Sequence, residues 1–159
     1  MIYNYQLEQH LIAGLIKNPN SFVEISPFIS EKDFFSDSSL LNKSLFFVIR
    51  NFIESGENLD EILISEKIKS LGINFEDDVD ILEYIQSICL RKVSPNSVID
   101  TAKELKKLTL RRDLSNAGSS IHKAMKRVSK ESYQEIIDSA DKIYNEIINS
   151  YESEGVSPM

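Results

Sequence analysis

The residues that could carry chemistry are few in this chain, and they are scattered along it. The one cysteine, Cys89, stands between Ile88 and Leu90 in an apolar stretch, which favours a buried small side chain over a nucleophile. His10 and His122 have no cysteine partner and no HExxH frame, so the sequence predicts no metal site. The five glycines are isolated and form neither a phosphate-binding GxxxxGK[ST] loop nor a dinucleotide-binding GxGxxG. We therefore expect no catalytic residue, no cofactor site and no self-sufficient enzyme in these residues.

An acidic cluster offers a second kind of chemistry, the binding of a cation. Its members are Glu76, Asp77, Asp78, Asp80 and Glu83. They lack the alternate-residue spacing and the glycine of a calcium loop. We interpret them as the solvated start of a helix.

A basic cluster could contact a nucleic-acid backbone. It contains Lys103, Lys106, Lys107, Arg111 and Arg112. No aromatic residue interleaves with it to stack on bases, so the favoured interpretation is that it neutralises acidic groups of the same chain. Direct DNA binding by this segment is the alternative.

Composition and charge narrow the class of protein. The chain has 159 residues and a net charge of -7, which argues against a general binder of nucleic acid or acidic membranes. Ile, Leu, Val and Phe make up about a third of it, enough for a core. A single cysteine excludes an internal disulfide and suits the reducing cytoplasm. Because there is no long apolar run and no signal peptide, we expect a cytoplasmic protein.

The elements that would position these residues are predicted to be helical throughout. In residues 1–93, apolar positions recur every three or four residues, and capping residues, Gly and Pro separate the runs. The predicted helices cover residues 7–16, 22–25, 38–54, 60–71 and 77–90, and the capping-box spacing of residues 30–33 opens another short helix. No stretch alternates apolar and polar residues as a strand would. The fold prediction is an all-α, compact multi-helix head.

Residues 94–151 are predicted to form a long antiparallel helical hairpin. Ser94-Pro95 is a helix start, and two runs of apolar residues then step by four and three, as in a heptad seam. The seam, taken as the dimer or partner interface, comprises Leu110, Leu114, Ala117, Ile121, Ala124, Val128, Tyr133, Ile137, Ala140, Tyr144, Ile147 and Tyr151. Residues 101–130 hold nine basic and two acidic side chains, whereas residues 131–159 hold one and seven. The two arms should therefore attract each other.

The apolar stripe of this hairpin is wider than one partner helix can cover. Ile136, Ile143 and Ile148 widen it on the second arm, and Leu105 and Leu108 on the first. Self-association through the hairpin would cover it, and so would folding of the head over the hairpin. The small residues 117–120 would permit a close helix crossing or simply weaken the helix.

Several short motifs, in order, resemble the N-terminal domain of DnaB-type replicative DNA helicases. Residues 7–16 resemble the opening helix of that family, and Asp33-Phe34-Phe35 its Asp-Phe-Tyr. Further matches are Phe46, residues 54–56, Asp60, Glu66, Ile68, Gly72, Ile81-Leu82, Ser94-Pro95-Asn96, and Leu110, Arg112 and Leu114 in a Leu-x-Arg-x-Leu pattern. The chain departs from the family in Asn42, which replaces a common His, and in Asp77-Asp78, which replace Gly-Gly. A divergent or phage-encoded relative would fit.

The resemblance implies an assembly and docking domain of a hexameric helicase. In that family the hairpins pair into dimers, three dimers form a collar, and the collar binds primase and influences loading by a helicase loader. ATP and Mg would belong to a separate RecA-like motor that moves on single-stranded DNA, and the small polar residues 152–159 resemble the start of the interdomain linker. We thus expect a fragment without the motor of a protein that unwinds DNA in the primosome. The alternative is a stand-alone helical adaptor that binds a replication protein.

Overall fold

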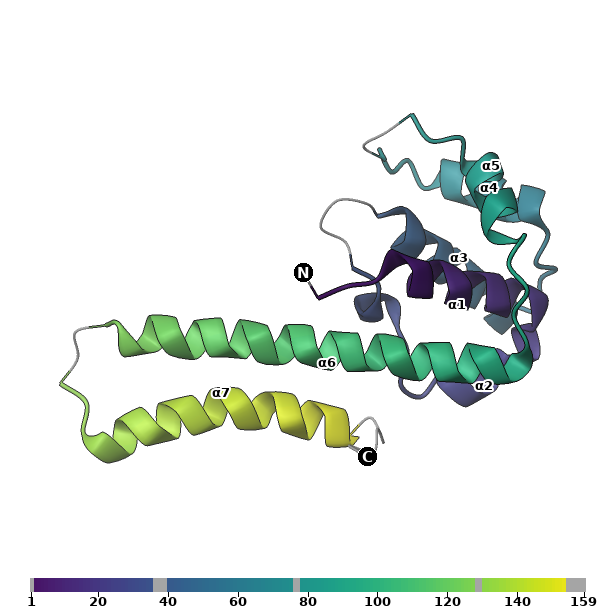
Figure 1. Ribbon diagram of the computed structural model, residues 1–159. Coiled ribbons are helices and arrows are strands. Elements are labelled where there is room, and N and C mark those ends of the chain that lie inside the picture. Colours follow the sequence, from purple (N-terminus) through teal and green to yellow (C-terminus); the bar gives the residue numbers. More distant parts are fainter. Residues whose placement is uncertain (1, 36–39, 76–77, 128–129, 154–159) are drawn as a thin grey trace. The chain divides into compact units, whose positions relative to one another are not determined.

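A computed structural model describes residues 2–35, 40–75, 78–127 and 130–153, and all regular structure within these ranges is helical (Figure 1). This confirms the all-α prediction. The elements are α1 (Tyr5–Lys17), η1 (Pro19–Ser21), α2 (Phe22–Ile25), η2 (Glu31–Asp33), α3 (Leu41–Glu54), α4 (Glu61–Ser70), α5 (Ile81–Ile88), α6 (Pro95–Met125) and α7 (Tyr133–Ser153). The chain divides into two compact units. The first, Tyr3–Lys107, is called the head unit below, and the second, from Leu108 on together with Ile2, the hairpin unit.

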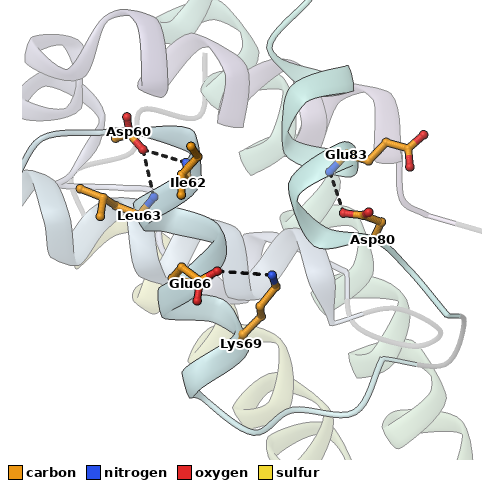
Figure 2. A network of polar contacts seen from close by, with 7 residues as sticks. All are labelled: Asp60, Ile62, Leu63, Glu66, Lys69, Asp80 and Glu83. Carbon is orange, nitrogen blue, oxygen red and sulfur yellow. Dashed lines mark hydrogen bonds and ion pairs between the residues drawn. The ribbon is translucent and has the colours of Figure 1, made fainter.

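Side-chain caps fix where the helices of the head unit begin. The Asn4 side chain accepts a hydrogen bond from the Leu7 amide at the start of α1. At the start of α4 the Asp60 carboxylate accepts from the amides of Ile62 and Leu63 at 2.8 and 3.1 Å (Figure 2). Such caps satisfy amide donors that have no partner within the helix. Gly56 and Gly72 end α3 and α4 with φ of 70° and 68°, a conformation that favours glycine.

The starts of two predicted helices differ from the structure by three residues or more. The helix predicted over 77–90 is α5, and it begins only at Ile81, because the Asp80 carboxylate accepts the Glu83 amide and caps it there (Figure 2). The helix predicted from residue 38 begins at Leu41; residues 36–39, like Asp77, lie outside the described residues. The capping box predicted at Ser30 is present, but the short helix predicted after it is a single 3-10 turn.

The core of the head unit is built around α1 and α3. Helix α1 packs against α3 and α5, and α4 packs against α3 and α5. Phe34 stacks on Phe46 with 4.7 Å between ring centroids, and both rings are buried. Other fully buried side chains are Leu11, Ile12, Leu15, Ile25, Leu45, Ile49, Ile64, Ile68, Ile85 and Leu105. Burial of each such side chain stabilises the fold by about 1.5–3 kcal/mol.

Gly14 lets α1 approach the start of α6 closely. A Cβ at this position would lie 2.6 Å from Cγ2 of Val98 and 2.8 Å from Cγ1 of Val93, and both valines are buried. Because β-branched side chains are stiff, they cannot move aside cheaply. We expect Gly14→Ala to lower the free energy of unfolding by about 1–2 kcal/mol, even after the better helix propensity of alanine is counted.

Gly118 is the matched control for that substitution. It lies inside α6, and a Cβ there would meet nothing within 4 Å. Gly118→Ala should therefore raise helix stability, by about 0.5–1 kcal/mol. Urea unfolding of both variants measures the difference, and an equal effect of the two substitutions would contradict the close approach at Gly14. Within this chain, the open space at Gly118 favours the weak-helix interpretation of residues 117–120.

Candidate interaction surface

The hairpin unit pairs the later part of α6 with α7. Helix α6 ends at Met125 and α7 begins at Tyr133, and the two run antiparallel, side by side (Figure 1). The Tyr151 hydroxyl donates a hydrogen bond to Oδ2 of Asp113 at 2.7 Å. This contact joins the C-terminal turn of α7 to α6, and both Tyr151 and the nearby Ala117 are buried.

The predicted seam lies on these two helices but is only partly closed. Its α6 members Leu110, Leu114, Ile121 and Ala124 and its α7 members Ala140 and Ile147 are half-buried. Tyr133, Ile137 and Tyr144 are 91%, 52% and 51% exposed. Val128 lies outside the described residues. The seam is thus buried at Ala117 and Tyr151 and open over the first half of α7.

A shallow groove of ≈ 260 Å³ runs between the two arms where the seam is half-closed. It is lined by Asp113, Asn116, Ala117, Ser120, Ile143, Glu146 and Ile147. The small side chains on α6 and the isoleucines on α7 leave space that neither arm fills. A two-helix layer therefore cannot bury this apolar stripe by itself.

The basic cluster is largely engaged within the chain. Lys106 is 3.6 Å from Oδ1 of Asp33, and Lys107 is 2.9 Å from Oε1 of Glu104. Arg112 donates to the Ile2 carbonyl at 2.8 Å and to Thr109 Oγ1. These contacts support the interpretation that the cluster neutralises and organises its own chain, although Lys103 and Arg111 are exposed.

The ion pair between Lys106 and Asp33 was not predicted. Both side chains are almost fully buried, with 3% and 0% exposed, and Oδ2 of Asp33 also accepts the Ser30 amide at 2.9 Å. A signal was present in the spacing, because Lys106 follows the buried Ala102 by four residues and so falls on the buried face of α6.

A second buried polar network joins α1, α3 and α5, and it too escaped prediction. Glu8 is fully buried; its carboxylate accepts the Phe35 amide at 3.0 Å and Nδ2 of Asn42 at 3.1 Å. The Tyr84 hydroxyl donates to Oδ1 of Asn42 at 2.5 Å and accepts from Gln9 at 3.0 Å. Burial raises the pKa of Tyr84, so the phenol stays a donor. The signal in the sequence was a charged residue on the apolar face of the first helix.

Cys89 was predicted to be a buried side chain, and the structure corrects this to a half-buried one at the end of α5. Burial, together with the neighbouring Glu61 carboxylate, raises the pKa of its thiol to about 11. The thiol is therefore protonated at neutral pH, which lowers its reactivity as a nucleophile.

This pKa predicts slow alkylation of Cys89 by iodoacetamide. At pH 8 a thiol with a pKa near 11 is about 0.1% thiolate, against roughly a quarter for an unperturbed cysteine. From these thiolate fractions, the native protein should react roughly 200-fold more slowly than the urea-unfolded chain, as measured by mass spectrometry. Glu61→Gln should raise the native rate, whereas equal rates for native and unfolded wild-type protein would contradict the raised pKa.

The described residues contain no group of three or more His, Cys, Asp or Glu that could hold a metal ion. His10 is half-buried and His122 is exposed. Burial, and then the charge of Arg91, lower the pKa of His10. In the described part of the chain, no helix is long and apolar enough to cross a membrane.

Comparison with known proteins gives the fold and the family. The model of the DnaB-like helicase N-terminal domain family matches residues 1–107. The chain belongs to this family. The fold also matches the crystal structure of the N-terminal domain of DnaB helicase from Mycobacterium tuberculosis, with a TM-score of 0.71 and 15% sequence identity over 89% of this chain and 96% of that one. A search of curated protein sequences found no match. Membership in the DnaB family confirms the resemblance inferred from the motifs.

Proposed function

We propose that this DnaB-family domain is the assembly and docking domain of a replicative helicase and that it dimerises through its hairpin. The observation that supports this most is the open seam. Tyr133, Ile137 and Tyr144 lie on one face of α7 and are at least half exposed. A second hairpin would cover this face, as knobs-into-holes packing of four helices does.

The proposal extends to the partners of the whole helicase. Dimers would join into a hexameric collar, and the collar would dock primase or a helicase loader. Unwinding of DNA would be driven by ATP and Mg in a RecA-like motor, which would also hold the single-stranded DNA. The support for this extension is membership in the DnaB family.

Sedimentation equilibrium of the chain and of Ile137→Asp tests the dimer. Ile137 is 52% exposed, so the substitution should leave the fold intact. It would place a carboxylate in an apolar interface, twice in a symmetric dimer. We expect the wild-type chain to dimerise and the variant to associate at least about tenfold more weakly.

Val23→Asp is the matched control, because Val23 is an exposed apolar residue of α2 in the head unit. It should associate as the wild type does. A wild-type chain that stays monomeric at high micromolar concentration, or equal association of all three proteins, would overturn the proposal.

A further inference from the structure

A second open surface lies in the head unit, where α3 ends and α4 runs past it. This α3–α4 groove has a volume of ≈ 530 Å³. It is lined by Phe52 of α3, by Glu57 and Asn58 of the following turn, and by Leu63, Glu66 and Lys67 of α4. The groove lies wholly within the unit Tyr3–Lys107, and its lining shares no residue with the hairpin seam.

The groove combines an apolar floor with an exposed apolar wall. Phe52 is nearly buried and forms the floor. Helix α4 turns Ile64 and Ile68 into the core, which leaves Ile62 and Leu63 on the outside, 58% and 53% exposed. The Asp60 carboxylate accepts hydrogen bonds from the amides of both residues in the first turn of the helix (Figure 2). Two large aliphatic side chains are thus presented to solvent on a rigid, capped helix.

The surroundings of the groove are acidic. Between residues 54 and 66 the chain has five acidic side chains and no basic one. They are Glu54, Glu57, Asp60, Glu61 and Glu66. Lys67 and Lys69 follow, and Lys69 is 3.4 Å from Glu66 (Figure 2). The field around the apolar floor therefore favours a positively charged occupant.

We propose that the α3–α4 groove docks a basic amphipathic helix of a partner protein. Such a helix presents apolar residues every three or four positions and would lay them on Phe52 and Leu63, while its lysines or arginines face the acidic rim. Apolar contact would supply the affinity. The opposite charges would set the orientation of the helix and raise its rate of association.

Residues 101–107 of a second copy are less suited to this groove than a partner helix is. Residues 101–107 hold three lysines, but the apolar side chains between them, Ala102 and Leu105, are buried in their own head unit. They cannot fill the groove of another molecule without unfolding. Residues 101–107 of a second copy would thus bring charge without an apolar face.

A titration with a designed helix tests the proposal on the whole chain. The probe is a labelled peptide of leucine and lysine, roughly 18 residues or five turns long, with leucine at every third or fourth position. The reference peptide has the same composition in scrambled order, so it has the same charge and no apolar face. Fluorescence anisotropy gives both affinities, and amide NMR shifts locate the site.

We expect the amphipathic peptide to bind at least about tenfold more tightly than the scrambled one and to shift amides of Leu63, Glu66 and Asn58. Leu63→Lys should weaken binding about tenfold, because it removes the apolar wall and reverses the local charge. Its matched control is Val23→Lys, at an exposed apolar residue of α2 outside the groove. Thermal unfolding of both variants verifies that each is folded.

Each of several results would overturn the proposal. They are equal affinity of the two peptides, unchanged binding by Leu63→Lys, an equal loss in Val23→Lys, and shifts confined to residues outside the groove. Concentration-dependent shifts at the groove and along α6 without peptide would assign the groove to a second copy instead of a partner helix.

Discussion

Lys106→Met is expected to lower the free energy of unfolding by about 3–5 kcal/mol, one of the two largest effects of any substitution proposed for this chain. The side chains of Lys106 and Asp33 are 3% and 0% exposed and 3.6 Å apart. Methionine fills a similar volume but carries no charge, so the carboxylate of Asp33 would remain in the interior without the lysine charge beside it. The cost is that of removing a buried cation from beside a buried anion.

Urea unfolding followed by circular dichroism measures this loss, and the adjacent lysine provides the control. Lys107 is exposed and pairs with Glu104 one helical turn away. Lys107→Met should change stability by no more than about 0.5 kcal/mol, as exposed helix pairs do. The double variant Lys106→Met, Asp33→Asn should recover part of the loss, since it removes both charges. Equal effects of the two lysine substitutions would contradict the buried pair.

Local sequence signals predicted the helices of this chain well because each depends on neighbours a few residues apart. Asp60 was predicted to open α4 and Gly56 to end α3, and both do so. The start of α5 was placed three residues or more too early, because several acidic residues in a row offer equivalent caps and only the structure shows that Asp80 is used.

The partners of buried polar residues could not be predicted, because they are far apart in the sequence. Asp33 and Lys106 are separated by more than 70 residues, and so are Gln9 and Tyr84. Spacing shows that Glu8 lies on an apolar face, yet it cannot show which donors come to meet it. Asn42, noted only as a departure from the family, proves to be the residue through which Glu8 and Tyr84 are joined.

The spacing of apolar residues predicted which positions form the candidate interface, but it did not predict how exposed each of them is. The steps of four and three place the described seam residues on α6 and α7 in the order expected. How tightly α6 and α7 pack together depends on the volumes of the side chains that face each other at each seam position. Ala117 and Tyr151 are buried, while Tyr133 at the other end is 91% exposed. The heptad pattern alone treats these positions as equivalent.

The Glu8 network should be the other large contributor to stability, and Glu8→Ala is expected to cost about 3–5 kcal/mol. The substitution removes the hydrogen bonds that the buried carboxylate accepts from Phe35 and Asn42, each worth about 1.5–3 kcal/mol. It also leaves the Phe35 amide and Nδ2 of Asn42 facing a cavity. Glu24→Ala, at an exposed acidic residue of α2, should change the free energy of unfolding by no more than about 0.5 kcal/mol.

A double-mutant cycle distinguishes a connected network from a set of separate contacts. If Glu8 acts through Asn42, then the losses in Glu8→Ala and Asn42→Ala should not add, and the coupling between them should reach about 1–3 kcal/mol. Tyr84→Phe removes only the hydroxyl that donates to Oδ1 of Asn42, so it should cost about 1–2 kcal/mol. In the Asn42→Ala background that cost should shrink. Additive losses throughout would mean that α1, α3 and α5 are held by apolar packing alone, with Glu8 no more than a tolerated buried charge.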